Sequence, residues 1–485
     1  MKPIVINNFS KGIASTPQEG FQELRNIDIV SDIGVAKIGL KAVDVSGGTV
    51  TATPLWFVNN PASTYYEIYA LDSNQTVYKT IDAGNGWTKI TGNGSGAGYG
   101  IAVWKNYLFV MRDVKIDVYG PLNGVASWTL DWQTIDTTGD AFHPALVGQD
   151  DILYIGCGRY LASIAETSGL TFAPGTASTY NFNSRALDLA ANYKIRALTE
   201  LGRYLMIGTY MGTYIYAGPQ IADIFPWDRT SPSFEQPIRI KEKGIHALTT
   251  IQNRMYIFAG VHGRCFISDG SNVDELFRVP ENLLTLTSGS YYEVYPGAIT
   301  FHEGRLLFGF TKSDDSTSDF AHVWSYDLKT GALAIENTNS TVTNANFAAQ
   351  KVGAIFSTGR KQYIFGWKGD SSDYGIDQIS TALRCVDYTA RIRLPYITAP
   401  DTALAEIEIE FTKPLLANQG VRLSYRTDLN ASFTTIDTID YATYGATMGE
   451  VVTLGITPDY GFQIQAELTT GSGLETPELK AIYIR

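Results

Sequence analysis

The amino-acid sequence predicts an all-β protein: a seven-bladed β-propeller with an N-terminal extended arm and a C-terminal β-sandwich. A strand–turn–strand unit recurs along most of the 485 residues. The composition points the same way, because 12% aromatic residues favour strands and 46 glycines suit tight turns. Apolar residues rarely recur at the spacing of an amphipathic helix, which argues against a helical protein.

The repeated unit is clearest in four segments, at residues 195–208, 245–260, 297–309 and 353–366. Each has an apolar strand, a turn with Gly or Asn and a basic residue, and a second apolar strand ending in Gly or Ala-Gly. Three weaker copies occupy residues 54–72, 100–113 and 144–158. The second strands recur at intervals of 41 to 57 residues, close to the ~40–50 residues of a four-stranded blade. We therefore expect a propeller over residues 41–384.

The pattern changes on both sides of the repeats. After residue 384, apolar and polar residues alternate in segments such as 405–415 and 461–470, as in half-buried strands. Residues 385–485 are therefore expected to form a β-sandwich with its own core. Residues 1–40 are polar and rich in turn formers, and we expect an extended arm.

The N-terminal region resembles a known group of proteins. NFSKGI at residues 8–13 is followed by GFQELRNIDI at 20–29 and DIGVAKIGLKAV at 32–43. An arm leading to Asn-x-Asp-hydrophobic, then a short strand after a glycine, is similar to the start of tailed-bacteriophage tail structural proteins of the β-propeller hub and nozzle type. The order of arm, propeller and terminal sandwich also resembles that group.

The resemblance implies a virion protein that forms a homo-oligomeric ring around the tail axis. Its partners are then other virion tail proteins, and genomic DNA passes without specific binding. No functional residues can be carried over from the group, and the resemblance implies no cofactor.

Charge and the N-terminus fit this interpretation. The chain has 37 Lys and Arg against 49 Asp and Glu, a net charge of −12, which disfavours tight general binding to nucleic acid. The apolar stretch at residues 4–6 is too short for a signal peptide, and no segment is long enough to span a membrane. We expect assembly in the host cytoplasm, a location in the virion and no membrane partner.

No catalytic or metal site is expected. Cys157, Cys265 and Cys385 are far apart and lack metal-ligand spacing, and no nucleophile elbow or phosphate-binding loop is present. Carboxylates at blade edges, such as Asp113, Asp269 and Asp327, are better explained as turn residues. We therefore predict that the chain is not an enzyme.

Two other functions remain open. The first is a tail protein that binds or cleaves host-surface carbohydrate with its propeller, the sandwich serving as a binding module. Residues 80–89 resemble the Asp box of sialidase-like propellers, but that box is a structural hairpin and supports only the fold. The second is an intracellular interaction scaffold.

A basic residue follows the first strand in five of the seven proposed blades, at Lys105, Arg203, Arg254, Arg305 and 360–361. Such turns open on one face of a propeller, so this end would carry a partial basic ring. We expect Arg203, Arg254 and Arg305 to contact a partner protein or subunit, since complementary charge steers docking.

Overall fold

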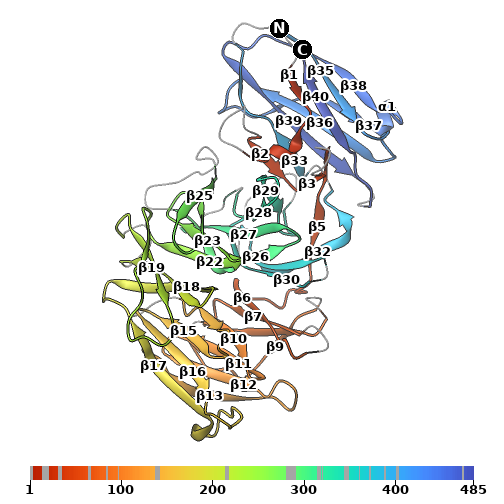
Figure 1. Cartoon of the computed structure of the whole chain (residues 1–485). Coiled ribbons are helices and arrows are strands. Elements are labelled where there is room, and N and C mark those ends of the chain that lie inside the picture. Colours follow the sequence, from red (N-terminus) through yellow and green to blue (C-terminus); the bar gives the residue numbers. More distant parts are fainter. Residues whose placement is uncertain are drawn as a thin grey trace.

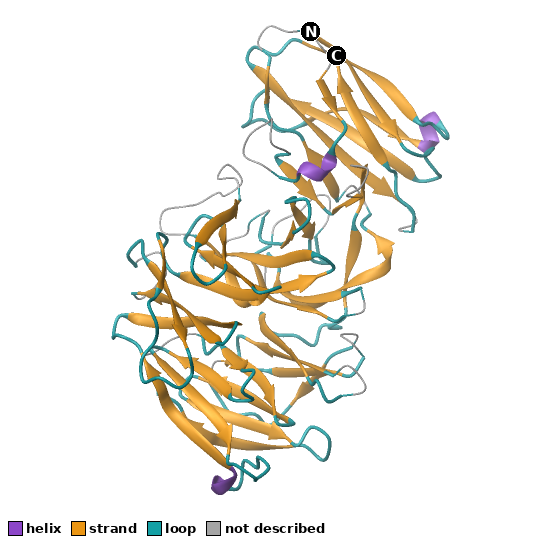
Figure 2. Cartoon of the chain, viewed as in Figure 1, coloured by secondary structure: helices purple, strands orange, loops and turns teal. Residues whose placement is uncertain are grey.

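The computed structural model is almost entirely β, with 59% of residues in strands and 2% in helices (Figure 2). This confirms the all-β prediction. The helical elements are the α-helix α1 (Tyr441–Tyr444) and the 3-10 turns η1 (Phe9–Lys11) and η2 (Ala177–Thr179). No helix in the described part of the chain could cross a membrane. The structure describes residues 4–13, 21–30, 35–63, 67–82, 86–96, 98–136, 142–212, 218–279, 291–313, 318, 320–342, 349–359, 361–370, 373–386, 389–399, 403–471 and 474–485.

The middle of the chain forms successive antiparallel four-stranded runs. Within the described residues, six runs are separate sheets, and the β26–β29 run belongs to a ten-stranded sheet. In chain order, the strands of the first three runs are β6 (Pro54–Asn59), β7 (Ile68–Asp72), β8 (Val77–Thr80) and β9 (Thr88–Ile90); β10 (Gly98–Trp104), β11 (Tyr107–Arg112), β12 (Lys115–Gly120) and β13 (Ser127–Thr134); and β14 (Ala145–Val147), β15 (Leu153–Cys157), β16 (Tyr160–Glu166) and β17 (Tyr180–Asp188).

The next four runs have the same form. Their strands are β18 (Tyr193–Leu201), β19 (Tyr204–Met211), β20 (Ala222–Trp227) and β21 (Ile238–Ile240); β22 (Ile245–Ile251), β23 (Arg254–Ala259), β24 (Arg264–Ser268) and β25 (Val273–Arg278); β26 (Tyr292–His302), β27 (Arg305–Lys312), β28 (Val323–Asp327) and β29 (Leu333–Asn337); and β30 (Lys351–Ser357), β31 (Tyr363–Lys368), β32 (Tyr374–Arg384) and β5 (Leu40–Asp44).

The first strands of these runs contact one another in a ring. Each first strand contacts the next one along the chain, in the order β6, β10, β14, β18, β22, β26 and β30. β30 then contacts β6, which completes the ring. This radial arrangement is that of a β-propeller (Figure 1). The outer strand of the last run, β5, comes from the N-terminal region and pairs with β32, with Ala42 opposite Ile379. The chain therefore closes the ring with a strand that precedes the first run.

The glycines that end the repeated unit lie in second strands, where the next first strand approaches the backbone closely. An alanine Cβ at Gly309 of β27 would lie 2.4 Å from Val352 Cγ1 of the next first strand. At Gly366 of β31 it would lie 2.5 Å from Pro54 Cβ of β6. Gly156 and Gly208 make similarly close approaches to β18 and β22. The missing side chain lets adjacent sheets pack closely around the ring.

Replacing Gly309 with alanine should therefore destabilise the propeller. The added Cβ would also lie 3.2 Å from the Val352 carbonyl oxygen, so a strand must shift. Overpacking of this kind costs about 1–3 kcal/mol, measurable by chemical denaturation. Gly175→Ala is the matched control, because nothing lies within 4 Å of its added Cβ. Equal stability of the two variants would contradict this packing account.

The C-terminal region contains two facing sheets (Figure 1). One sheet contains β1 (Ile4–Ile6), β3 (Ile27–Val30), β4 (Val35–Ile38), β40 (Leu479–Ile484), β35 (Leu404–Phe411) and β38 (Gly449–Ile456). The other contains β2 (Glu23–Arg25), β33 (Ala390–Arg393), β34 (Ile397–Thr398), β39 (Gly461–Thr470), β36 (Gln419–Arg426) and β37 (Thr434–Asp440). Ile407 and Ile409 of the first sheet share one apolar core with Ile464 and Leu468 of the second.

The N-terminal region differs from the expected extended arm over residues 1–40. β1 pairs with the last strand of the chain, with Ile4 opposite Ile484. β3 and β4 form a hairpin in the same sheet, and β2 lies in the facing sheet. Apolar residues such as Leu24 and Ile27 are buried in the common core. Burial of these side chains favours strand pairing over an exposed arm.

The same segment joins the two halves of the molecule. β2 pairs in parallel with β29, with Arg25 opposite Ile335, and antiparallel with β33. One ten-stranded sheet therefore runs from a propeller run into the C-terminal region.

Asn26 lies at this junction, fully buried and with a φ of 51°. Its side-chain Nδ2 donates to Thr338 Oγ1 and to the Thr389 carbonyl oxygen, both at 3.2 Å, and its Oδ1 accepts from Thr338 N at 3.0 Å. Thr338 follows β29 and Thr389 precedes β33. Asn26 therefore ties the propeller to the C-terminal sheets.

Candidate functional site

The turns between first and second strands gather at one end of the propeller. Hydrogen bonds between neighbouring sheets show this: Thr199 Oγ1 lies 3.0 Å from Thr250 Oγ1, and His302 Nδ1 lies 3.0 Å from Ser357 Oγ. All four residues lie near the end of a first strand. We call this end the hairpin face, formed within the described residues by the turns at residues 60–63, 105–106, 148–152, 202–203, 252–253 and 303–304, and by the last turn at 358–359 and 361–362.

The three predicted contact arginines all lie at these turns but differ in surroundings. Arg203 is exposed, and its guanidinium lies 4.8 Å from the Tyr204 ring centroid. Arg254 is exposed at the start of β23. Arg305 is only partly exposed and forms an ion pair with Glu336 of β29, which raises its pKa. Arg203 and Arg254 are thus the two of the three that present their charge to solvent.

Acidic groups interrupt the expected basic ring. Lys105 is ion-paired with Asp151 and Glu166, and Glu200 accepts from Gln149 N at 2.9 Å. Residue 360 lies outside the described residues. The hairpin face therefore carries mixed charge.

A buried charged cluster connects three first strands. Arg196 of β18 forms an ion pair with Glu293 of β26, and His246 Nδ1 of β22 lies 3.7 Å from Glu293 Oε2. The Arg196 guanidinium lies 4.3 Å from the Phe142 ring centroid. Burial raises the pKa of Glu293, but the attraction of Arg196 outweighs it and holds that pKa below its ordinary value. This carboxylate is kept ionised as a partner of Arg196, which indicates a structural role.

The carboxylates considered as catalytic candidates do not form a pair. Asp269 Oδ1 accepts from Ser271 N and Asn272 N, both at 2.9 Å. Asp327 Oδ1 accepts from Lys329 N and Thr330 N, both at 2.8 Å. These contacts are those of turn residues. Asp113 lies in the separate turn between β11 and β12. Among the described residues, no group of three His, Cys, Asp or Glu side chains is placed to hold a metal.

The cysteines are buried and unpaired. Burial raises the pKa of the Cys385 thiol to about 12, and it also raises the pKa values of Cys157 and Cys265. Thiols in this state are poor nucleophiles and metal ligands.

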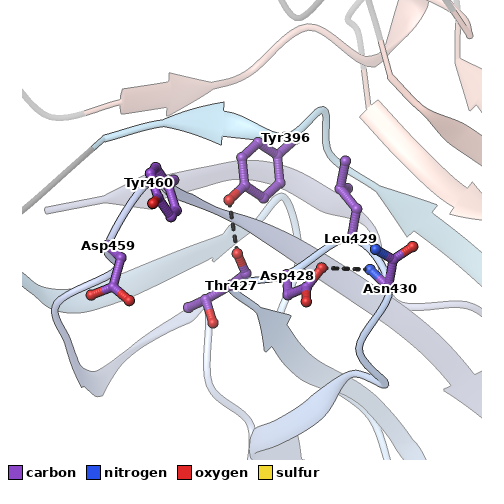
Figure 3. Close-up of a pocket in the computed structure, with 7 residues that line it drawn as sticks. All are labelled: Tyr396, Thr427, Asp428, Leu429, Asn430, Asp459 and Tyr460. Atoms are coloured by element: carbon purple, nitrogen blue, oxygen red, sulfur yellow. Dashed lines mark hydrogen bonds between the residues drawn. The ribbon is translucent and has the colours of Figure 1, made fainter.

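The C-terminal region has a hollow with a volume of about 550 Å³ (Figure 3). We call it the tyrosine hollow. Three chain segments meet there: the β33–β34 connection, the loop after β36 and the loop before β39. Its lining residues are Tyr396, Thr427, Asp428, Leu429, Asn430, Asp459 and Tyr460.

Hydrogen bonds within the protein hold one side of this hollow. The Tyr396 hydroxyl donates to the Thr427 carbonyl oxygen at 2.7 Å, and Asp428 Oδ1 accepts from Asn430 N at 2.8 Å. Beneath the loop, Arg426 Nη1 donates to the Leu429 carbonyl oxygen at 2.6 Å. These contacts position Tyr396 and the 427–430 loop relative to each other.

Sequence reasoning missed both the hollow and the Arg196–Glu293 pair. Tyr396, the 427–430 loop and the 459–460 pair are separated along the chain, and no motif connects them. The one local signal is Tyr460, an aromatic residue in the loop between β38 and β39 that is exposed in the structure.

Comparisons with known proteins found propeller structures of low similarity. No family model matches the chain, and no curated protein matches it. Similar solved structures include the computationally designed Ika8 protein (16% identity, TM-score 0.41, 74% of this chain and 97% of that one). YCF48 bound to a D1 peptide has 12% identity, a TM-score of 0.44, and coverage of 70% and 95%. An exo-β-1,3-galactanase from Phanerochaete chrysosporium has 9% identity, a TM-score of 0.34, and coverage of 92% and 99%. At these values the similarities carry no argument about function.

Proposed function

We propose that the chain is a non-enzymatic structural protein of a tailed-bacteriophage virion, a ring-forming tail component of the hub, nozzle or adaptor type. In this proposal the seven four-stranded runs are seven blades of one closed propeller, and the two facing C-terminal sheets form a β-sandwich. The partners are other tail proteins and further copies of the chain, and genomic DNA passes along the ring axis.

The junction between the two halves is the observation that supports this proposal most. Domains of one chain move relative to each other by default unless their interface is large and apolar. Here β2 continues a propeller sheet into the C-terminal region, and buried Asn26 bonds to both sides. A fixed geometry between two domains suits a component of a larger assembly. Asn26 also begins the Asn-x-Asp-hydrophobic segment on which the phage-tail resemblance depends.

The hairpin face is the proposed contact with a neighbouring protein or subunit. Arg203 and Arg254 lie on neighbouring sheets of this face with exposed side chains. Arginine is enriched at interfaces because its planar guanidinium both stacks and donates several hydrogen bonds. Arg305 belongs to the same face, but it is already neutralised by Glu336.

The double variant Arg203→Ser, Arg254→Ser tests this assignment. We expect the concentration at half-assembly to rise about tenfold or more in sedimentation velocity, as when interface anchors are truncated. Exposed turn substitutions usually change stability by less than ~0.5 kcal/mol, so the fold should survive.

Arg159→Ser is the control at the other end of a sheet. Arg159 lies 4.8 Å from the Tyr160 ring centroid, like Arg203 over Tyr204, but it is partly buried, forms an ion pair with Asp188 and lies in a turn between second and third strands. Such turns lie at the opposite end of a sheet. Equal weakening by the control, or none by the double variant, would contradict the assignment.

The proposal also predicts no glycosidase activity. A glycosidase uses two carboxylates about 5–9.5 Å apart around the scissile bond, whereas Asp269 and Asp327 are each bound within their own turns. Incubation with host polysaccharide should release no reducing sugar. Turnover abolished by a single Asp or Glu substitution would favour the carbohydrate-cleaving alternative.

A further inference from the structure

We propose that the tyrosine hollow binds a neutral saccharide. Nothing in the proposed structural role requires such a site, and the inference is independent of ring formation. Its volume of about 550 Å³ is within the range of small-molecule pockets, about 300–1,000 Å³. The space suits one or two sugar rings.

The aromatic groups supply the first part of the argument. Tyr460 is 78% exposed, which leaves much of an aromatic residue in water. Tyr396 lines the same hollow, with its hydroxyl bonded to the Thr427 carbonyl oxygen (Figure 3). A sugar has one face of C–H groups and a polar edge. Stacking that face on Tyr460 removes apolar surface from water on both partners.

The polar groups define what the ligand must offer. Ionised carboxylates accept hydrogen bonds and cannot donate them, so Asp428 and Asp459 require a donor such as a hydroxyl group. Asn430 contributes an amide that can both donate and accept. Among the described residues, the Asp459 carboxylate and the Asn430 amide have no hydrogen-bonding partner, so both are available to a ligand.

The charge of the lining residues disfavours anionic ligands. The seven lining residues carry two negative charges and no positive charge, so sialic acids, uronic acids and phosphates would be repelled. Nearby Arg426 offsets part of this negative charge, but its guanidinium donates to the Leu429 and Ala431 carbonyl oxygens and to Gln463, and Arg426 does not line the hollow.

Geometry favours a neutral saccharide over a cation. An aromatic cage surrounds an ammonium group with several rings, whereas here Tyr460 is open to solvent. A hard cation needs six or more converging oxygens, and the described residues show no metal-binding group of three acidic, His or Cys side chains. The loop contacts of Tyr396 and Arg426 preorganise the wall, which lowers the entropic cost of binding.

Calorimetry with defined probes tests this site in the full chain. The neutral probes are maltotriose, cellotriose and triacetylchitotriose, and the comparators are 3′-sialyllactose, choline and calcium chloride. We expect at least one neutral trisaccharide to bind with a dissociation constant on the order of 0.1–1 mM, about tenfold or more tighter than every comparator.

Single substitutions then locate the binding. Tyr460→Ala should weaken it about tenfold or more, and Asp459→Asn should weaken it measurably; both side chains are exposed, so the fold should persist. Tyr441→Ala is the control, because Tyr441 is also an exposed tyrosine of the C-terminal region but lies outside the hollow. The proposal is overturned if no neutral probe binds, if choline or calcium binds more tightly, or if Tyr460→Ala leaves saccharide binding unchanged.

Discussion

Asn26→Ala is expected to destabilise the protein by about 3–5 kcal/mol. The substitution removes three buried hydrogen bonds and leaves the Thr338 N–H and the Thr389 carbonyl oxygen without their partner. Each unsatisfied buried group costs about 1–3 kcal/mol. A left-handed backbone also disfavours alanine by about 1–2 kcal/mol. Urea unfolding monitored by tyrosine and tryptophan fluorescence measures the change.

Asn253→Ala separates the loss of hydrogen bonds from the backbone preference. Asn253 has a φ of 62° and an exposed side chain in a hairpin turn, so its substitution costs only the backbone preference. We expect Asn26→Ala to lose about 2 kcal/mol more than this control. Similar losses in the two variants would mean that the junction contacts contribute little.

Glu23→Gln has the second large expected effect. Glu23 is fully buried on β2, and its carboxylate faces three arginines: Arg25 Nε at 2.8 Å, Arg393 Nη1 at 2.9 Å and Arg391 Nη1 at 3.8 Å. Removing one partner of a buried ionic group costs about 3–5 kcal/mol because the remaining charges lose their compensation. Glu408→Gln, which breaks an exposed pair with Arg485, should cost less than ~1 kcal/mol.

The effect of Glu23→Gln should depend on pH. Burial raises the pKa of Glu23, but the three arginines outweigh it and lower that pKa from 4.5 to about 2. An acid with a lowered pKa in the folded state stabilises the fold above its unfolded pKa and loses that contribution as pH falls. The stability difference between wild type and variant should therefore be constant above about pH 5 and shrink between 4.5 and 2. A difference independent of pH would contradict the ionised assignment.

The sequence was most informative where packing repeats. The repeated unit ending in glycine corresponds to second strands in which Gly208, Gly309 and Gly366 admit the neighbouring first strand. The turn role of Asp269 and Asp327 was also predictable, because Asp bonds backbone groups two or three residues ahead. The repeated glycine and the turn aspartates are both visible in short stretches of sequence, so neither requires knowledge of tertiary contacts.

Long-range pairing was not predictable. β1 and β2 have three residues each, and their partners include Ile484 and Ile392, hundreds of positions away. Segments this short carry little periodicity, so polar composition suggested an arm. The tyrosine hollow escaped notice for the same reason, since Tyr396 and Tyr460 meet only after β33 and β39 have paired.

Native mass spectrometry of the purified chain tests the central claim, that the protein is a ring-forming structural component, most directly. The account predicts one dominant closed oligomer with a mass that is a whole-number multiple of 53.2 kDa. It further predicts that this species dissociates in the Arg203→Ser, Arg254→Ser variant and persists in Arg159→Ser. A 53.2 kDa monomer at every concentration from micromolar upward would contradict the ring-forming role.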